Sequence, residues 1–246
     1  MRPRKIYGWL PDIPDQRDYL YKAIQPVIRL PRKVDLRGLC SEIERQGDLG
    51  SCTAQALAGN IEFLDKISDF KYTDVSRLFI YYNERALMHT IRYDSGSSLR
   101  TGIKTLKNSG VCEEALWPYL ISKFALKPPL KCLTDAKKHR ITSYHRINTL
   151  NEMLACLAEG YPFVFGFTVY ESFESQEVLE TGTVPMPKKK EKAIGGHAVM
   201  AVGYNRTAER FIVRNSWGKD WGKAGYCTMP IEYLQTLAGD FWTIRN

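Results

Sequence analysis

The sequence predicts an α+β fold in which a helical first half precedes a β-rich second half. Apolar residues recur at helical spacing between about residues 52 and 108, whereas short apolar runs dominate after residue 162. With 246 residues, the chain is long enough to bury a core without disulfide or metal staples. We expect an N-terminal extension over 1–29 and one folded body over 30–246, mainly helical to about residue 145 and mainly β from about residue 146.

The composition is that of a globular protein with a basic balance. Hydrophobic residues make up 44% and charged residues 25%, which excludes a disordered or fibrous chain, and the net charge is +8. No apolar stretch approaches the roughly eighteen residues of a membrane span. The basic stretches at 127–140 and 188–192 carry no nucleic-acid motif, so we expect no nucleic-acid partner. The stretch at 188–192 is either a basic rim of a substrate cleft that attracts acidic substrates or a solvated loop. The nearby glutamates favour the solvated loop.

The extension is predicted to be extended because prolines interrupt it. Aromatic residues such as Tyr7, Trp9 and Tyr19, together with Ile13, offer anchors on the body. Its basic start is not followed by an apolar h-region, so we expect no signal peptide. The prediction is therefore a cytoplasmic location, or export by a route that needs no N-terminal signal peptide.

Helices are predicted where apolar spacing coincides with caps. The first begins at Cys52 and reaches about Ile67. Two more helices are predicted to begin at serine caps. One ends near Leu87, and the other ends near Asn108, where Gly110 stops it. A fourth covers Thr149 to Glu159, and we expect residues 123–146 to be a connector between the halves.

Strands are predicted for the remaining apolar runs. Asn205 to Arg210 is polar, so the two strands beside it are predicted to form a hairpin. The runs are Pro162–Val169, His197–Tyr204, Phe211–Ser216, Tyr226–Met229 and Trp242–Ile244.

Cys52 stands out because it opens an amphipathic helix. Backbone N–H groups and the helix dipole favour a thiolate at that position. By itself such a cysteine is more often a buried, inert core residue. A nucleophile also needs a proton carrier, and His197 has a strand setting and small neighbours, with Asn215 brought near it by the predicted hairpin. The combination favours nucleophilic catalysis.

These residues carry a resemblance to the papain-like cysteine peptidases, peptidase family C1. The separation of His197 from Cys52, 145 positions, falls within the ~130–150 typical of that family. The resemblance spans about residues 30–246 in the family's motif order. The matching segments are Leu30-Pro31-x-x-Val34-Asp35-Leu36-Arg37, Gln46…Gly50-Ser51-Cys52, Gly196-His197-Ala198-Val199-x-x-Val202-Gly203-Tyr204 and Asn215-Ser216-Trp217-Gly218-x-x-Trp221-Gly222-x-x-Gly225-Tyr226.

The resemblance implies a two-lobed fold, with a helical half, an antiparallel β-barrel-like half and the active-site cleft between them. It implies that Cys52 attacks the peptide carbonyl, with His197 as its imidazolium partner and Asn215 orienting the ring. Gln46 would donate to the oxyanion, and Trp217 would cover the hydrogen bond between His197 and Asn215. The expected activity is a cysteine-type endopeptidase that works through an acyl-enzyme.

Two other activities stay open. Acyl transfer to an amine uses the same intermediate, and a non-catalytic relative would bind peptides without turnover. The expected partner is a peptide or protein substrate, the expected oligomeric state is a monomer, and no cofactor is expected. The remaining cysteines show no metal-ligand spacing, so no metal site is expected, although one pair could be bridged.

The sequence departs from the family pattern near the nucleophile. Leu49 and Asp94 stand where the resemblance implies a disulfide, which points to a reducing compartment or to a fold that does not rely on the bridge. Thr53 replaces the aromatic residue that usually follows the nucleophile. The resemblance also implies substrate contacts at Gly50, Ser51, Gly96, Ser97, Gly166, Gly195, Gly196, Ala198 and Trp217.

The role of residues 1–29 has two hypotheses. Relatives often carry a pro-segment that runs through the cleft, but about 29 residues are too few for the usual helical pro-domain. The extension is either a structural strap, which we favour, or a short inhibitory segment. Deletion of 1–29 separates the two, because a soluble and more active product contradicts the strap and an unfolded product contradicts the inhibitor.

The resemblance places Gly166, Gly195 and Ala198 in the S2 pocket, and their small size implies a roomy pocket without built-in charge. We expect the enzyme to prefer large apolar or aromatic side chains at the second position before the scissile bond. Screening a peptide library for cleavage measures this preference, and selection of Gly or Asp at that position would contradict it.

Overall fold

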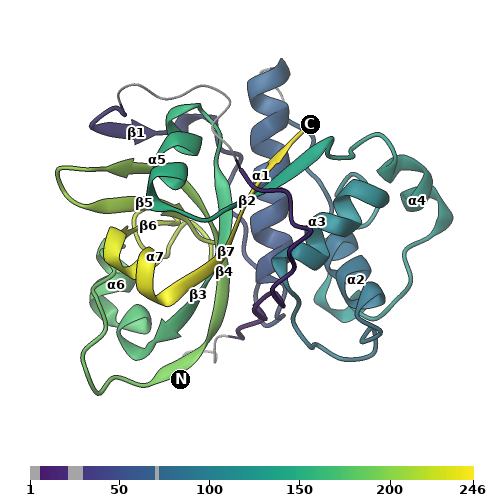
Figure 1. Ribbon diagram of the computed structural model, residues 1–246. Coiled ribbons are helices and arrows are strands. Elements are labelled where there is room, and N and C mark those ends of the chain that lie inside the picture. The colour runs from purple at the N-terminus through teal and green to yellow at the C-terminus, as the bar shows by residue number, and fades with distance from the viewer. Residues whose placement is uncertain (1–5, 22–29, 70–71) are drawn as a thin grey trace.

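The computed structural model describes residues 6–21, 30–69 and 72–246. Helix α1 (Cys52–Asp69) runs between a group of helices and a sheet (Figure 1). On one side of it lie α2 (Arg77–Leu87), α3 (Leu99–Asn108) and α4 (Leu130–Ala136). The sheet on the other side carries α5 (Leu150–Ala158), α6 (Gln176–Thr181) and α7 (Ile231–Leu237), and the short helices η1 (Arg37–Leu39), η2 (Ile121–Lys123) and η3 (Glu171–Glu174) complete the set.

The caps explain where the predicted helices begin and end. The Ser76 and Ser98 side chains accept the backbone N–H of the third residue of α2 and of α3. Thr149 and Glu152 form a reciprocal capping box at the start of α5. Gly110, just past α3, has a φ of +80°, which favours glycine. All four predicted helices are confirmed.

The strands form one antiparallel sheet that does not close. Their order is β2-β7-β3-β4-β5-β6, with β1 paired to β4, so the sheet has free edges and is not barrel-like in the closed sense. β4 and β5 pair directly, as the predicted hairpin requires. The strands are β1 (Lys33–Asp35), β2 (Ser143–Ile147), β3 (Phe163–Tyr170), β4 (Ala193–Asn205), β5 (Arg210–Arg214), β6 (Tyr226–Pro230) and β7 (Ala238–Arg245).

Alternation along β4 divides the interior into two cores. Ala198, Met200 and Val202 pack with α1, α2 and α3, whereas Val199 and Ala201 pack with α5 and α7 on the opposite face. Because the strand is buried on both faces, its sequence is a nearly continuous apolar run. The face of β4 that touches α1 is thereby placed next to the start of that helix.

The expected connector at 123–146 is wrong in part. It contains α4 and most of β2, which pairs with the C-terminal strand β7. α4 is seven residues long and has no side-chain cap, and β2 is mostly half-buried, so neither gives a strong periodic signal. Their formation depends on tertiary packing and on the distant β7.

The extension crosses the junction between the halves (Figure 1). Backbone pairing attaches it at Trp9, which bridges Ser97, and at Leu20, which bridges Arg146. Of the expected anchors, Ile13 is wrong, since it is 82% exposed. Tyr19 is 66% exposed but packs its ring on edge against Tyr144, with 5.9 Å between the ring centroids. The part of the prediction that concerns residues 1–5 and 22–29 lies outside the described residues.

Charged groups hold the middle of the extension. The buried Asp12 carboxylate accepts the Trp242 indole N–H at 2.8 Å and the Arg100 backbone N–H at 3.1 Å. Asp18 pairs with the guanidinium groups of Arg100 and Arg146, and Arg146 also bonds Asp240 at 3.0 Å. Buried carboxylates need such partners, so acidic rather than apolar side chains fasten this segment.

No helix within the described part of the chain is long and apolar enough to cross a membrane.

We predict that Asp12→Ala lowers the free energy of unfolding by about 2 kcal/mol, because it leaves the Trp242 and Arg100 N–H groups buried without an acceptor. Urea denaturation measures the change. The matched control is Asp15→Ala, whose carboxylate bonds the exposed Arg17 and should change little. Equal stability of the two variants would contradict the prediction.

Candidate active site

Cys52 is the first residue of α1 and lies against β4. The backbone N–H groups of Ala198, of Thr53 and of Gly8 in the extension point to its sulfur. Its side chain is fully buried, and burial raises the pKa of the thiol to about 11 despite these donors. With the extension in place, burial therefore opposes the thiolate form of Cys52.

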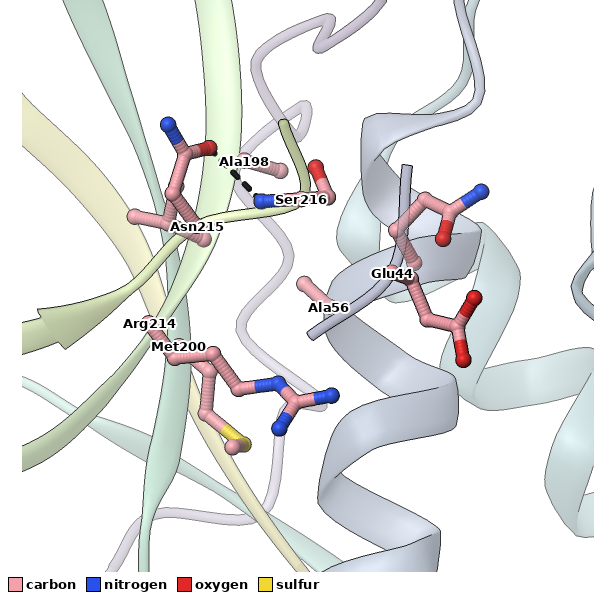
Figure 2. A pocket seen from close by; sticks show the side chains of 9 residues that line it. Glu44, Ala56, Ala198, Met200, Arg214, Asn215 and Ser216 are labelled. Carbon is pink, nitrogen blue, oxygen red and sulfur yellow. Dashed lines mark hydrogen bonds between the residues drawn. The ribbon is translucent and has the colours of Figure 1, made fainter. Parts of the chain in front are cut away.

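His197 precedes Ala198 on β4, so the strand whose Ala198 N–H points to the Cys52 sulfur also carries the imidazole. His197 Nε2 and Asn215 Oδ1 are 2.8 Å apart. Asn215 follows β5, and its Oδ1 also accepts the Ser216 backbone N–H at 2.8 Å, a bond drawn in Figure 2. The hairpin of β4 and β5 thus brings the imidazole and the amide together.

Aromatic rings surround this pair and exclude water. The Trp217 ring lies 4.9 Å from the His197 ring, centroid to centroid, at an angle of 31°. Phe167, which is paired with His197 across β3 and β4, lies 5.8 Å away on edge. A hydrogen bond in such surroundings does not compete with solvent.

The Gln46 side chain is oriented by two neighbours. Its Oε1 accepts the Ser216 hydroxyl at 2.7 Å, and its Nε2 donates to the Leu49 carbonyl at 3.1 Å. The same Nε2 lies 3.4 Å from the Ile6 carbonyl of the extension. The amide is thus directed at a peptide carbonyl in the cleft. Ser216 was not singled out from the sequence, although it lies within the motif that begins at Asn215.

Asp94 supports the loop before the nucleophile without a covalent bond. Its carboxylate accepts the Gly50 backbone N–H at 3.0 and 3.1 Å and also the Tyr81 hydroxyl. Leu49, the other residue at the expected bridge position, is buried in the core. A charge-assisted hydrogen bond therefore stands where the resemblance implied a disulfide.

The extension touches most of the residues for which substrate contacts were expected. Trp9 donates its backbone N–H to Gly196 at 3.0 Å, and the N–H of Leu10 bonds Ser97 at 2.9 Å. The Trp9 indole covers Gly166, where an added Cβ would lie 1.9 Å from a ring carbon. Gly8 faces Gly50 and Gly96, Tyr7 faces Gly195 and Trp217, and Ala198 adjoins Cys52.

Ser51 is the exception among those residues. It is fully buried, and its hydroxyl lies 2.6 Å from that of Tyr119, which also donates to the Gln46 carbonyl at 2.9 Å. It supports the loop instead of facing the cleft. Tyr119 was missed because it belongs to no motif and reaches the loop only through the fold.

Among the described residues, three side chains outside the cleft lie close enough together to hold a metal ion. Glu113, Asp135 and His139 offer ligand atoms within 4.8 Å of one another. Lys138 Nζ lies 2.5 Å from Asp135, however, so an ion pair already neutralises that carboxylate. All six cysteines are buried free thiols, and no disulfide links them.

The site combines a thiol at the start of a helix, an imidazole on a strand with the amide that orients it, and an oriented glutamine side chain. This combination defines the class of thiol proteases. The family model described as papain family cysteine protease matches residues 30–236, and the chain belongs to this family. Membership confirms the α+β papain-like fold and the peptidase activity, and it does not favour acyl transfer or a non-catalytic role.

Individual relatives agree with this assignment. An uncharacterised peptidase C1-like protein of Acanthamoeba polyphaga mimivirus is 43% identical over 98% of this chain and 86% of its own length. Xylellain, a cysteine protease from Xylella fastidiosa, is 41% identical with a TM-score of 0.91 over 100% of this chain and 99% of its own. Chymopapain of Carica papaya is 27% identical over 86% of this chain and 57% of its own length.

Proposed function

We propose that Cys52, His197, Asn215 and Gln46 carry out peptide hydrolysis in this papain-family enzyme. The observation that supports this most directly is the contact of the Cys52 sulfur with the strand that carries His197. In the open cleft, the Cys52 thiolate attacks the scissile carbonyl and His197 protonates the leaving amine. The acyl-enzyme is then hydrolysed by water that His197 activates.

The other two residues act around that pair. Asn215 accepts a ring N–H of His197 and so fixes the ring orientation. Gln46 Nε2 and the Cys52 backbone N–H stabilise the oxyanion, as the approach of Gln46 to the Ile6 carbonyl suggests. Trp217 shields the His197–Asn215 bond from water.

We also propose that the extension inhibits the enzyme as well as strapping it. The Gly8 backbone N–H lies at the Cys52 sulfur, so the extension occupies the space in front of the nucleophile. Trp9 lies over Gly166, where the substrate side chain that enters the S2 pocket would lie. The extension therefore fills the cleft and blocks access to the thiol.

The same contacts suggest what the cleft accepts. A backbone N–H bonded to Gly196 and an indole packed over Gly166 are the interactions of an extended peptide with an aromatic side chain. We propose a peptide or protein substrate with such a residue at the second position before the scissile bond, and no nucleic acid. Both halves of the site come from one chain, which supports a monomer as the active form. The six free thiols support a reducing compartment such as the cytoplasm.

We predict that a thiol-directed epoxide forms one adduct at Cys52 and abolishes peptide hydrolysis. The full-length Trp9→Ala variant is used, so that the cleft is open, and intact mass and cleavage of a fluorogenic peptide are measured. Cys52→Ala in this background should lose the adduct and at least about 10³-fold in kcat. The control Cys40→Ala keeps both, since that buried thiol lies outside the cleft. An adduct that persists without Cys52 would overturn the assignment.

We predict that Trp9→Ala raises kcat/KM of the full-length chain about tenfold or more, because removing the indole deprives the docked extension of its main side-chain contact in the cleft. Steady-state hydrolysis measures the change. The matched control is Ile13→Ala, an exposed residue of the same extension, which should leave kcat/KM unchanged. This substitution is more informative than deleting 1–29, since deletion also removes Asp12 and Asp18. Unchanged kcat/KM in Trp9→Ala would contradict inhibition.

A further inference from the structure

One residue of the extension lies on the leaving-group side of the cleft. Gly8 stands in front of the Cys52 sulfur, and Trp9 lies over Gly166, on the side where the residues before the scissile bond bind. Tyr7 lies on the other side of Gly8. It therefore occupies the place of the substrate residue that comes directly after the scissile bond.

The surroundings of Tyr7 support this placement. Its ring lies 6.1 Å from the His197 ring and 6.2 Å from the Trp217 ring, centroid to centroid. His197 protonates the leaving amine in the proposed reaction, so a side chain that contacts its ring lies next to the departing half of the substrate. A Cβ added at Gly195 would lie 2.5 Å from a carbon of the Tyr7 ring, so this glycine leaves space for a large side chain.

A carboxylate meets the far end of the Tyr7 side chain. The Tyr7 hydroxyl donates a hydrogen bond to Oε1 of Glu174, the last residue of η3. Burial, together with this carboxylate, raises the pKa of Tyr7, so the hydroxyl stays protonated and remains a donor. Within the described part of the chain, the Glu174 carboxylate has no other hydrogen bond or ion pair. It is therefore available to a donor on a substrate once the cleft opens.

The groove beside Tyr7 has room for longer side chains. It has a volume of about 710 Å³, and its lining includes Ile6, Tyr7, Glu174 and Ile194. Glu174 is exposed, so a lysine or arginine can reach its carboxylate while the charged group stays hydrated. An acidic side chain would instead meet a like charge, which opposes binding.

The neighbouring glutamate Glu191 does not replace Glu174. Its carboxylate accepts the backbone N–H of Ser172 at 2.5 Å and that of Lys188 at 2.9 Å. These bonds hold the loop before β4 against η3. Glu191 therefore has a structural role, whereas the carboxylate of Glu174 faces the extension.

We propose that Glu174 is a specificity-determining residue that selects a side chain with a hydrogen-bond donor, tyrosine or a basic residue, directly after the scissile bond. The proposal rests on the proposed peptidase role of Cys52 and His197, and it adds the residue that recognises the leaving half of the substrate. Tyr7 of the extension shows how such a side chain is held.

The test is the cleavage of four quenched fluorescent peptides by the full-length Trp9→Ala chain. The peptides share phenylalanine at the second position before the scissile bond and differ only in the residue after it, which is Tyr, Phe, Lys or Glu. We expect kcat/KM to be about fivefold higher for Tyr than for Phe, and at least about tenfold higher for Lys than for Glu. Product masses identify the cleaved bond.

Substitution of Glu174 in this chain shows whether its carboxylate is the cause. Glu174→Ala should lower the rate for the Tyr peptide to that for the Phe peptide, and Glu174→Lys should make the Glu peptide better than the Lys peptide. The matched control Glu177→Ala removes an exposed glutamate of α6 and should keep the parent preferences. Each variant should cleave the Phe peptide at about the parent rate, which reports that it is folded.

The outcomes separate the specificity from the peptidase role. Equal rates for the Tyr and Phe peptides, or parent preferences in Glu174→Ala, would overturn the role of Glu174 and leave the peptidase assignment intact. If none of the four peptides is cleaved, the roles of Cys52 and His197 fail, and the proposal fails with them.

A double-mutant cycle in the chain with Trp9 intact tests the contact itself. Tyr7→Phe removes only the hydroxyl and should raise kcat/KM about threefold, because the docked extension is held less tightly. In the Glu174→Ala background the same substitution should have no further effect. An equal rise in both backgrounds would show that the hydroxyl acts without Glu174 and would overturn the proposal.

Discussion

The site depends on the close approach of α1 to β4. Ala56 of the helix lies near Ala198 and Met200 of the strand, and the small side chains of Ala56 and Ala198 let the two backbones come together. This contact places Cys52 beside the residue next to His197, although the two are 145 positions apart. Arg214 ties the same junction, since its guanidinium bonds the carbonyls of Ser41 and Glu42 at 2.6 Å and passes close to Gly59 of α1. A larger side chain at this contact would separate the nucleophile from its proton carrier.

The extension is held by two kinds of interaction with different consequences. In the cleft it relies on backbone hydrogen bonds and on the space above glycines, which are features that any extended peptide with a suitable side chain can use. Outside the cleft it relies on Asp12 and Asp18, whose partners are Arg100, Arg146 and Trp242. The second set keeps the first at a high effective concentration, so weak substrate-like contacts suffice to fill the site.

Around the nucleophile, hydrogen bonds to carboxyl groups stand where the family resemblance implies a disulfide and an aromatic ring. Asp94 holds the Gly50 N–H where the family resemblance implies a disulfide, and Glu84 with Thr53 fills space where it implies an aromatic ring. Such bonds need no oxidising environment, which agrees with six free cysteines.

The sequence by itself determined the elements with local signals and the motif residues. Capped helices such as Ser76–Leu87 and the β4–β5 hairpin could be predicted because caps, periodicity and a polar turn act over a few neighbouring residues. Cys52 and His197 could be singled out because their residue types and spacing suit one chemistry. Only the tertiary structure decided that Ser216 orients Gln46, that Glu84 reaches Thr53, that α4 and β2 form, and that Trp9 lies over Gly166. These contacts join segments distant in the chain, and a hydrogen bond or a buried charge between such segments leaves no periodic trace in either of them.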